Sequence, residues 1–133
     1  MPSCVIDTSA IMAVLLGEPD RATLVRQTEG LELVAPASVH WEIGNALSAG
    51  LKRRRFGLAE ARRAVTAYDM IPIRFVDVSL SESLDVSAQH GVYAYDAYLL
   101  ACARQQRSPL LTLDLALARV AQAIGVDLLL PPP

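Results

Sequence analysis

The stretch Ser3-Cys4-Val5-Ile6-Asp7-Thr8-Ser9-Ala10 contains the pattern from which the fold of this 133-residue chain can be read. A short apolar run ends directly at an aspartate, and the hydroxyl residues Thr8 and Ser9 can then cap a helix over residues 10–16. Continuous apolar runs are typical of parallel strands that are covered on both faces. We therefore place Asp7 at the carboxyl end of a buried strand, where a bare charge is costly.

The same alternation of strands and helices continues along the chain and predicts an α/β fold with a mainly parallel sheet. Pro36 is expected to break the chain, Ser38 to cap the helix after it, and Ser79 with Glu82 to form a capping box. The strands are expected at residues 3–6, 31–34, 73–76, 110–112 and 126–130. The helices are expected at residues 10–16, 20–29, 38–51, 58–70, from 79 to about 90, 95–105 and 115–124.

The composition limits the class of protein. Hydrophobic residues make up 53% of the chain, above the usual share of about 45–50%, and the formal net charge is -2. Any contact with nucleic acid must therefore come from a local basic patch. Cys4 and Cys102 have no paired spacing and are expected to be small buried side chains in a reducing compartment. With no signal peptide and no membrane-spanning run evident, we expect one cytoplasmic domain over residues 1–133.

Four acidic residues stand among apolar ones: Asp7, Glu42, Asp96 and Asp114. Asp7 and Asp114 follow predicted strands, Asp96 begins a predicted apolar helix, and Glu42 lies on the helix after the second strand. Because ligand sites in open α/β sheets form beyond the carboxyl ends of the strands, we expect the four to meet at one edge. Taken singly, Asp7 or Asp114 would more often be a helix cap than a metal ligand, and for the set of four the spacing alone leaves both interpretations open.

Clustered carboxylates repel one another, and no lysine or histidine recurs beside these four to neutralise them. A divalent cation would neutralise the four carboxylates. Mg²⁺ prefers carboxylate and phosphate oxygens as ligands, and Mn²⁺ is a close alternative. Such a site suits hydrolysis of a phosphodiester, because the ion activates water and neutralises developing charge. The two histidines, His40 and His90, have no metal-binding spacing.

Four motifs occur in the order and spacing of a known family. They are Val5-Ile6-Asp7-Thr8-Ser9-Ala10, Glu42 with Asn45-Ala46-Leu47, Tyr95-Asp96-Ala97, and Leu111-Thr112-Leu113-Asp114. No single motif is specific, but the ordered set resembles the PIN domain over essentially the whole chain. More narrowly, the chain resembles the VapC-type ribonuclease toxins of prokaryotic toxin–antitoxin pairs.

This resemblance implies a three-layer α/β/α sandwich and a Mg²⁺- or Mn²⁺-dependent endoribonuclease. The family's acidic quartet maps onto Asp7, Glu42, Asp96 and Asp114. Asp7 and Asp96 would be the main metal ligands, Asp114 would share that ion or hold a second, and Glu42 would act through water or orient the nucleophile. The supporting side chains would be Ser9, Asn45 and Thr112. The family also implies a homodimer and a cognate antitoxin whose chain covers the site.

Two further clusters have open roles. Lys52-Arg53-Arg54-Arg55, with Arg62 and Arg63 nearby, either grips RNA phosphates or forms a solvated helix end. Trp41 and the group Tyr93, Tyr95 and Tyr98 are expected to pack in the core, with base stacking or a dimer interface as the alternative.

Two other classes of function fit the sequence less well than a nuclease. An aspartyl phosphatase needs a second aspartate two residues after the first, where Ser9 stands, and a phosphoacceptor receiver needs a late lysine, whereas the single lysine is Lys52. A non-catalytic PIN-like module that binds RNA or protein would be expected to lose acids, and all four are present.

Overall fold

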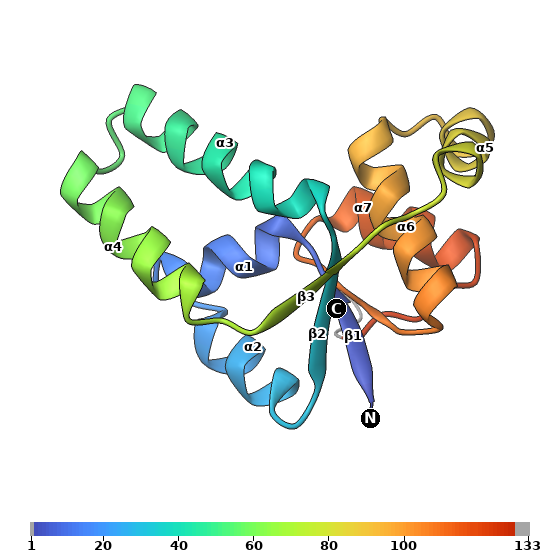
Figure 1. The fold of residues 1–133 in the computed structure, drawn as a ribbon, viewed down its shortest axis with the longest axis horizontal. Helices are drawn as coiled ribbons and strands as arrows, with labels where there is room; N and C mark the ends of the chain where they lie inside the picture. Colours follow the sequence, from blue (N-terminus) through green and yellow to red (C-terminus); the bar gives the residue numbers. More distant parts are fainter. Residues whose placement is uncertain (1, 130–133) are drawn as a thin grey trace.

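The computed structural model describes residues 2–129 and has a four-stranded parallel sheet at its centre (Figure 1). The strands are β1 (Ser3–Ile6), β2 (Glu32–Pro36), β3 (Ile73–Val76) and β4 (Leu110–Leu111). Their order across the sheet is β3-β2-β1-β4, and every neighbouring pair is parallel. The strand order therefore reverses between β1 and β4, which is where open α/β sheets bind ligands.

Helices cover both faces of the sheet and confirm the three-layer α/β/α arrangement (Figure 1). One layer holds α1 (Thr8–Leu15), α2 (Arg21–Thr28), α3 (Ser38–Lys52) and α4 (Leu58–Asp69). The other layer holds α5 (Leu80–His90), α6 (Ala94–Gln106) and α7 (Leu115–Ala123). β1, β4 and most of β2 are sandwiched between these layers, which explains their continuous apolar runs, whereas the edge strand β3 carries the exposed Arg74.

The core lies where β1, β2 and α6 meet. Val5 and Val34 on the strands and Leu100 and Cys102 on α6 are completely buried. Burial raises the pKa of the Cys102 thiol to about 12 and that of the Cys4 thiol to about 11, so both are protonated, inert core residues. This confirms the prediction that they are small hydrophobic side chains, and both are free thiols.

The predicted strand at residues 126–130 was wrong in extent. Within the described residues it is a single parallel bridge between Leu110 and Leu128, flanked by bonds from the Leu110 amide to the Asp127 carbonyl and from the Leu129 amide to the Leu110 carbonyl. Residue 130 lies outside the described residues. Because β4 is only two residues long, it offers too few backbone groups to pair a full strand on its outer side.

Three local predictions about chain breaks and caps were also wrong. Pro36 does not break β2 but is its last residue, and the ladder continues through the Ala37 amide to the Val76 carbonyl. Thr8 and Ser9 do not cap α1; Asp7 does, by accepting from the Ala10 amide, which confirms the alternative that Asp7 is a helix cap. Ser38 is the first residue of α3 and makes no capping bond. The Ser79 cap of α5 was predicted correctly, since its hydroxyl accepts from the Glu82 amide.

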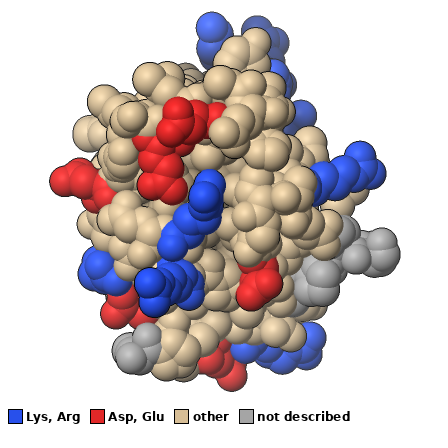
Figure 2. All heavy atoms as spheres, turned by 90° about the vertical axis from the view of Figure 1, so that its right-hand side faces the viewer, with Lys and Arg blue, Asp and Glu red and all other residues tan. Residues whose placement is uncertain are grey.

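No helix among the described residues is long and apolar enough to cross a membrane. On the face formed by the α5–α7 side, acidic and basic side chains are both present and interspersed (Figure 2). This mixture agrees with the near-neutral net charge and with the expectation that any basic surface is local.

Gly50 allows α3 to extend to Lys52 while packing against the chain that returns from it. The residue is buried, and a Cβ built on it would lie 2.2 Å from Cζ of Phe56 and 2.5 Å from its Cε2. The aromatic ring therefore occupies the space that a side chain would need. Gly44, on the same helix, is exposed, and a Cβ added there would meet no atom within 4 Å.

We predict opposite effects for alanine at these two glycines. Gly44→Ala should stabilise the protein by up to about 1 kcal/mol through helix propensity alone. Gly50→Ala should instead destabilise it by roughly 1–3 kcal/mol because the Phe56 ring must move. Urea denaturation of both variants measures the difference, and equal stabilisation by both would contradict the packing described.

Candidate metal centre

Asp7 is the most buried of the four predicted acids, with 4% of its surface exposed. Its Oδ1 accepts from the Ala10 amide at 3.0 Å and lies 2.7 Å from Ser9 Oγ, while Oδ2 lies 2.9 Å from the same hydroxyl and accepts from Thr112 Oγ1. Burial raises the pKa of Asp7, and these bonds from Thr112, Ala10 and Ser9 oppose that rise. The carboxylate is thus held in one orientation by donors that favour its charged form.

Ser9 and Thr112 also join the ends of β1 and β4. The Ser9 hydroxyl accepts from the Leu113 amide at 3.0 Å, and the Thr112 hydroxyl accepts from the Asp114 amide at 3.0 Å. The two strands that flank the reversal in strand order therefore end in one hydrogen-bonded network around Asp7. The structure places both predicted supporting hydroxyls beside the acids.

Glu42 enters the same region from α3 and is half-buried. Burial raises the pKa of Glu42, the repulsion of Asp7 and Asp96 raises it further, and the nearby Thr8 hydroxyl lowers it. The Thr8 hydroxyl is near enough to the Glu42 carboxylate to lower its pKa, but the two do not meet in hydrogen-bonding geometry, and neither Glu42 Oε1 nor Thr8 Oγ1 has another partner among the described residues, although both atoms are buried. A buried, unsatisfied carboxylate oxygen is unusual and marks a place where a ligand atom is expected.

Asp96 lies in the first turn of α6, as predicted, and is half-buried. Burial raises its pKa, and the charge of Asp114 raises it further. Asp114 is exposed, so the expectation that it occupies a costly buried position was wrong. Its chain segment leaves β4 and turns outward, and the carboxylate caps α7 by accepting from the amides of Ala116 at 3.0 Å and Leu117 at 3.2 Å.

The repulsions that raise these pKa values connect the four acids in a closed ring. Asp7 is coupled to Asp114, Asp114 to Asp96, Asp96 to Glu42, and Glu42 back to Asp7. Within residues 2–129, no carboxylate of the ring forms an ion pair with a basic side chain. We call these four residues the acid ring. The structure brings all of them together at the carboxyl edge of the sheet.

The acid ring fits a hydrated divalent cation. In the described part of the chain, no three acidic, cysteine or histidine side chains stand close enough to enclose a bare ion. Mg²⁺ usually keeps several waters and binds protein through one or two carboxylates, so it does not require such a cage. The unsatisfied Glu42 oxygen and the uncompensated charge of the ring are what such an ion would neutralise.

A cavity of about 470 Å³ opens beside the acid ring. Ser38, Trp41, Glu42 and Asn45 line it from α3, and Tyr95 lines it from α6. Asn45 is exposed on this wall, three residues after Glu42 on the same helix face. Thr8, which faces Glu42, was not predicted as a site residue. Its position directly after Asp7, at the start of α1, was the available signal.

The prediction that the aromatic residues pack in the core was wrong for three of the four. The exposed fractions are 76% for Trp41, 89% for Tyr93 and 58% for Tyr95, whereas Tyr98 is half-buried. Each exposed residue lies at a helix start or on the outer stripe of α3, where no other described element covers it.

The basic run Lys52-Arg53-Arg54-Arg55 is fully on the surface at the end of α3. The helix continues past Gly50 to Lys52, so the run begins about 15 Å along the axis from Glu42, at ~1.5 Å per residue. Arg54 has a positive φ of 55°, which turns the chain sharply after the helix. The run therefore lies at the C-terminal end of the helix that carries Glu42, and not within the acid ring.

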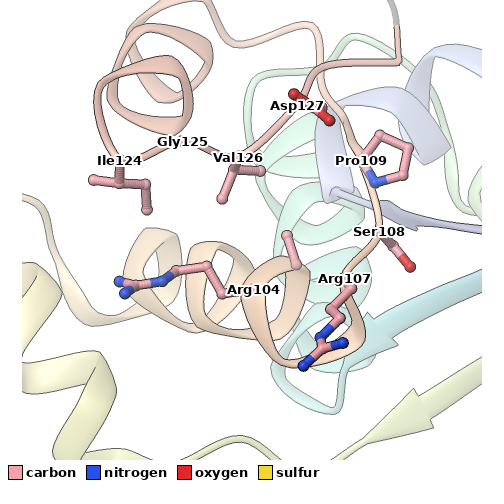
Figure 3. Close-up of a pocket in the computed structure, with 9 residues that line it drawn as sticks. Arg104, Arg107, Ser108, Pro109, Ile124, Gly125, Val126 and Asp127 are labelled. Carbon is pink, nitrogen blue, oxygen red and sulfur yellow. The ribbon is translucent and has the colours of Figure 1, made fainter.

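A second cavity, of about 430 Å³, lies at the ends of α6 and α7, by the start of β4 (Figure 3). Arg104 and Arg107 line it, but Figure 3 shows their guanidinium groups pointing in different directions. Asp127 and the carbonyl-bearing ends of two helices add negative charge there. These features disfavour a multiply charged anion, so we assign no function to this cavity.

Comparison with known proteins gives one consistent family. The PIN domain profile matches residues 4–123. Ribonuclease VapC9 of Mycobacterium tuberculosis is 32% identical to this chain over 121 residues, which cover 90% of this chain and 91% of that protein.

Solved structures agree on the fold. The crystal structure of PAE2754 from Pyrobaculum aerophilum superposes with a TM-score of 0.70 at 22% identity, covering 90% of this chain and 79% of that chain. A toxin–antitoxin complex from Klebsiella pneumoniae superposes with a TM-score of 0.68 at 15% identity, covering 98% and 100% of the two chains.

The raised pKa of Glu42 predicts how stability depends on pH in the absence of metal. A carboxyl group with a raised pKa in the folded state stabilises the fold when protonated, and this stability is lost as the pH rises above about 4 and through the raised value. Glu42→Gln should therefore raise stability at neutral pH by about 0.5–2 kcal/mol and flatten the pH dependence. Thermal unfolding in a chelator across this pH range is the measurement.

Asp85→Asn, at an exposed position of α5, is the matched control and should change neither quantity appreciably. If the wild-type protein is more stable than Glu42→Gln at neutral pH, the charged Glu42 side chain does not destabilise the fold and the prediction is wrong.

Proposed function

The chain belongs to the PIN-domain family and, within it, to the VapC ribonucleases, and we propose that it is a Mg²⁺-dependent endoribonuclease that acts as the toxin of a type II toxin–antitoxin pair. The observation that carries this proposal is the acid ring. Four carboxylates from four separate segments share one edge of the sheet, repel one another and have no basic partner within residues 2–129.

Each acid has a distinct place in the proposal. Asp7 and Asp96 would be the main ligands of the ion, and Asp114 would share it or hold a second one. Glu42 would coordinate the ion through water or orient the attacking nucleophile. A bound divalent ion supplies an activated water and neutralises charge on the phosphate during hydrolysis. Mn²⁺, which also prefers oxygen ligands, should substitute for Mg²⁺.

Ser9 and Thr112 are positioning residues in this proposal. Their hydroxyls donate to the Asp7 carboxylate and so oppose the rise in its pKa that burial causes. They also fix its rotamer, which matters because metal-assisted reactions are sensitive to small displacements of the ligands. Asn45, which lines the cavity beside the acid ring, would contact the RNA substrate there.

The partners are proposed from the family and, for the antitoxin, from the charge of the acid ring. We propose that a cognate antitoxin covers the acid ring and brings a basic side chain into it, and that the toxin is a homodimer. A toxin–antitoxin complex is among the structures with this fold, which supports an antitoxin partner. RNA is the proposed substrate because the family members that match in sequence are ribonucleases.

We predict that the protein cleaves a panel of structured RNAs in Mg²⁺ and that Asp7→Asn and Asp96→Asn abolish at least 99% of this activity, as expected for loss of a metal ligand (about 10- to 100-fold even for outer partners). Asp85→Asn should cleave like the wild type. Cleavage by the two site variants at the wild-type rate would overturn the proposed site. No cleavage by any well-folded form would overturn the proposed function and favour a non-catalytic PIN-like binding module.

The basic run provides a separate prediction about RNA binding. Replacing Lys52 to Arg55 by glutamine should weaken RNA binding and reduce the slope of log affinity against log salt by up to about 3, at ~0.7 per phosphate contact on a single strand. Binding is measured in the Asp96→Asn background so that the RNA stays intact.

Glutamine at Arg21 and Arg26 on α2 serves as a control for the loss of positive charge elsewhere on the surface, and its effect is compared with that of glutamine at Arg53 and Arg54 alone. If the Lys52–Arg55 variant keeps the wild-type salt slope, the run is a solvated helix end and not an RNA contact.

A further inference from the structure

Two aromatic side chains are exposed on the walls of the cavity beside the acid ring. Trp41 projects from α3 and Tyr95 from the first turn of α6, next to Glu42 and Asp96 respectively. Large aromatic side chains bury more apolar surface than most others, so leaving two of them in water at one cavity is unfavourable unless something covers them. Their exposure is therefore a functional signal.

Each of the two rings is held in place by an aromatic neighbour. The Trp41 ring meets His40 edge to face, with centroids 4.7 Å apart, and His40 is fixed in turn by a 2.9 Å bond between its Nδ1 and the Tyr68 hydroxyl. The Tyr95 ring meets Tyr98 edge to face at 6.0 Å. These contacts restrict the rotamers of both rings, which reduces the conformational entropy lost when a flat ligand stacks on them.

The cavity also has polar groups that lack partners. Residues 38, 41, 42 and 45 form one stripe of α3, spaced as i, i+3, i+4 and i+7. On this stripe Ser38 Oγ and Glu42 Oε1 are buried and make no hydrogen bond to another described residue. The Asn45 amide stands at the end of the same stripe. The cavity therefore combines flat apolar walls with hydrogen-bonding groups.

We propose that this cavity binds an unpaired RNA base next to the cleaved phosphodiester, with Trp41 and Tyr95 as stacking surfaces and Ser38 and Asn45 as contacts to the base edge. The inference rests on the proposed ribonuclease function and deepens it by naming single-stranded or flipped-out RNA as the substrate. A base has two apolar faces and a polar edge, which matches the walls and the unpartnered groups. Its position sets a phosphate beside the acid ring.

The chemistry of the cavity favours a base over an apolar peptide segment. A hydrophobic side chain in the cavity would seal Ser38 Oγ and the Glu42 carboxylate from water without giving either a hydrogen bond, at roughly 1–3 kcal/mol for each group. A base can stack on both rings and still bond at its edge. Protein occupants are therefore an alternative outcome of the test rather than part of the proposal.

The chain contains a single tryptophan, so its fluorescence reports on this cavity directly. In the Asp96→Asn background, an unstructured oligoribonucleotide of mixed sequence is titrated and compared with an abasic oligonucleotide of the same length and charge. We expect quenching by the first and little or none by the second. Trp41→Leu and Tyr95→Leu should each weaken binding by about 5- to 150-fold, as for loss of one stacked base.

Conservative and remote variants separate stacking from loss of structure. Trp41→Phe and Tyr95→Phe should keep most of the affinity because they keep a ring. Tyr93→Leu removes a still more exposed tyrosine that does not line the cavity, and should leave binding unchanged. In the enzyme with Asp96 intact, loss of Tyr95 should raise KM for RNA more than it lowers kcat.

The outcomes distinguish this inference from the proposed function. If the protein cleaves RNA but Trp41→Leu and Tyr95→Leu bind and cleave as well as wild type, the inference is wrong and the function stands. If no RNA is bound or cleaved, both are wrong. If the Trp41 fluorescence changes with protein concentration but not with RNA, a second copy of this chain covers the cavity. This result also overturns the inference.

Discussion

The buried carboxylate of Asp7 is the constraint on which the rest of this structure depends. An anion with only 4% of its surface exposed must be compensated by hydrogen bonds or charge. Ser9, Thr112 and the Ala10 amide supply the hydrogen bonds, and in doing so they fix the start of α1 and join the ends of β1 and β4. The hydrogen bonds that offset the desolvation of the Asp7 carboxylate therefore also fix the geometry of the site.

What these hydrogen bonds do not supply is countercharge. Asp114, Asp96 and Glu42 add negative charge around Asp7, and burial together with mutual repulsion raises the pKa of every member whose shift is resolved. The fold thus maintains an electrostatic strain at the reversal of strand order. Strain of this kind reduces stability and is retained where a ligand relieves it, which is the usual exchange of stability for function.

The sequence was sufficient for the sheet, the layers and the convergence of the acids, because parallel strands bring every residue that follows a strand to one edge. It was not sufficient where the outcome depends on what covers a residue. Trp41 and Tyr95 are large aromatic residues of a type that often packs in the core. They are exposed because no described element packs over that side of α3 and α6. Asp114 interrupts an apolar run of the sequence, yet it is exposed at the start of α7, where its carboxylate caps the helix.

The central claim is that the acid ring is one divalent cation site organised by Asp7. Crystals grown or soaked with Mn²⁺ test it most directly, through anomalous scattering from the ion. The account predicts a peak at the carboxyl edge of the sheet, in contact with Asp7 and Asp96 directly or through water, that disappears in Asp7→Asn. An ion bound elsewhere, or a peak that persists unchanged without the Asp7 carboxylate, would contradict it.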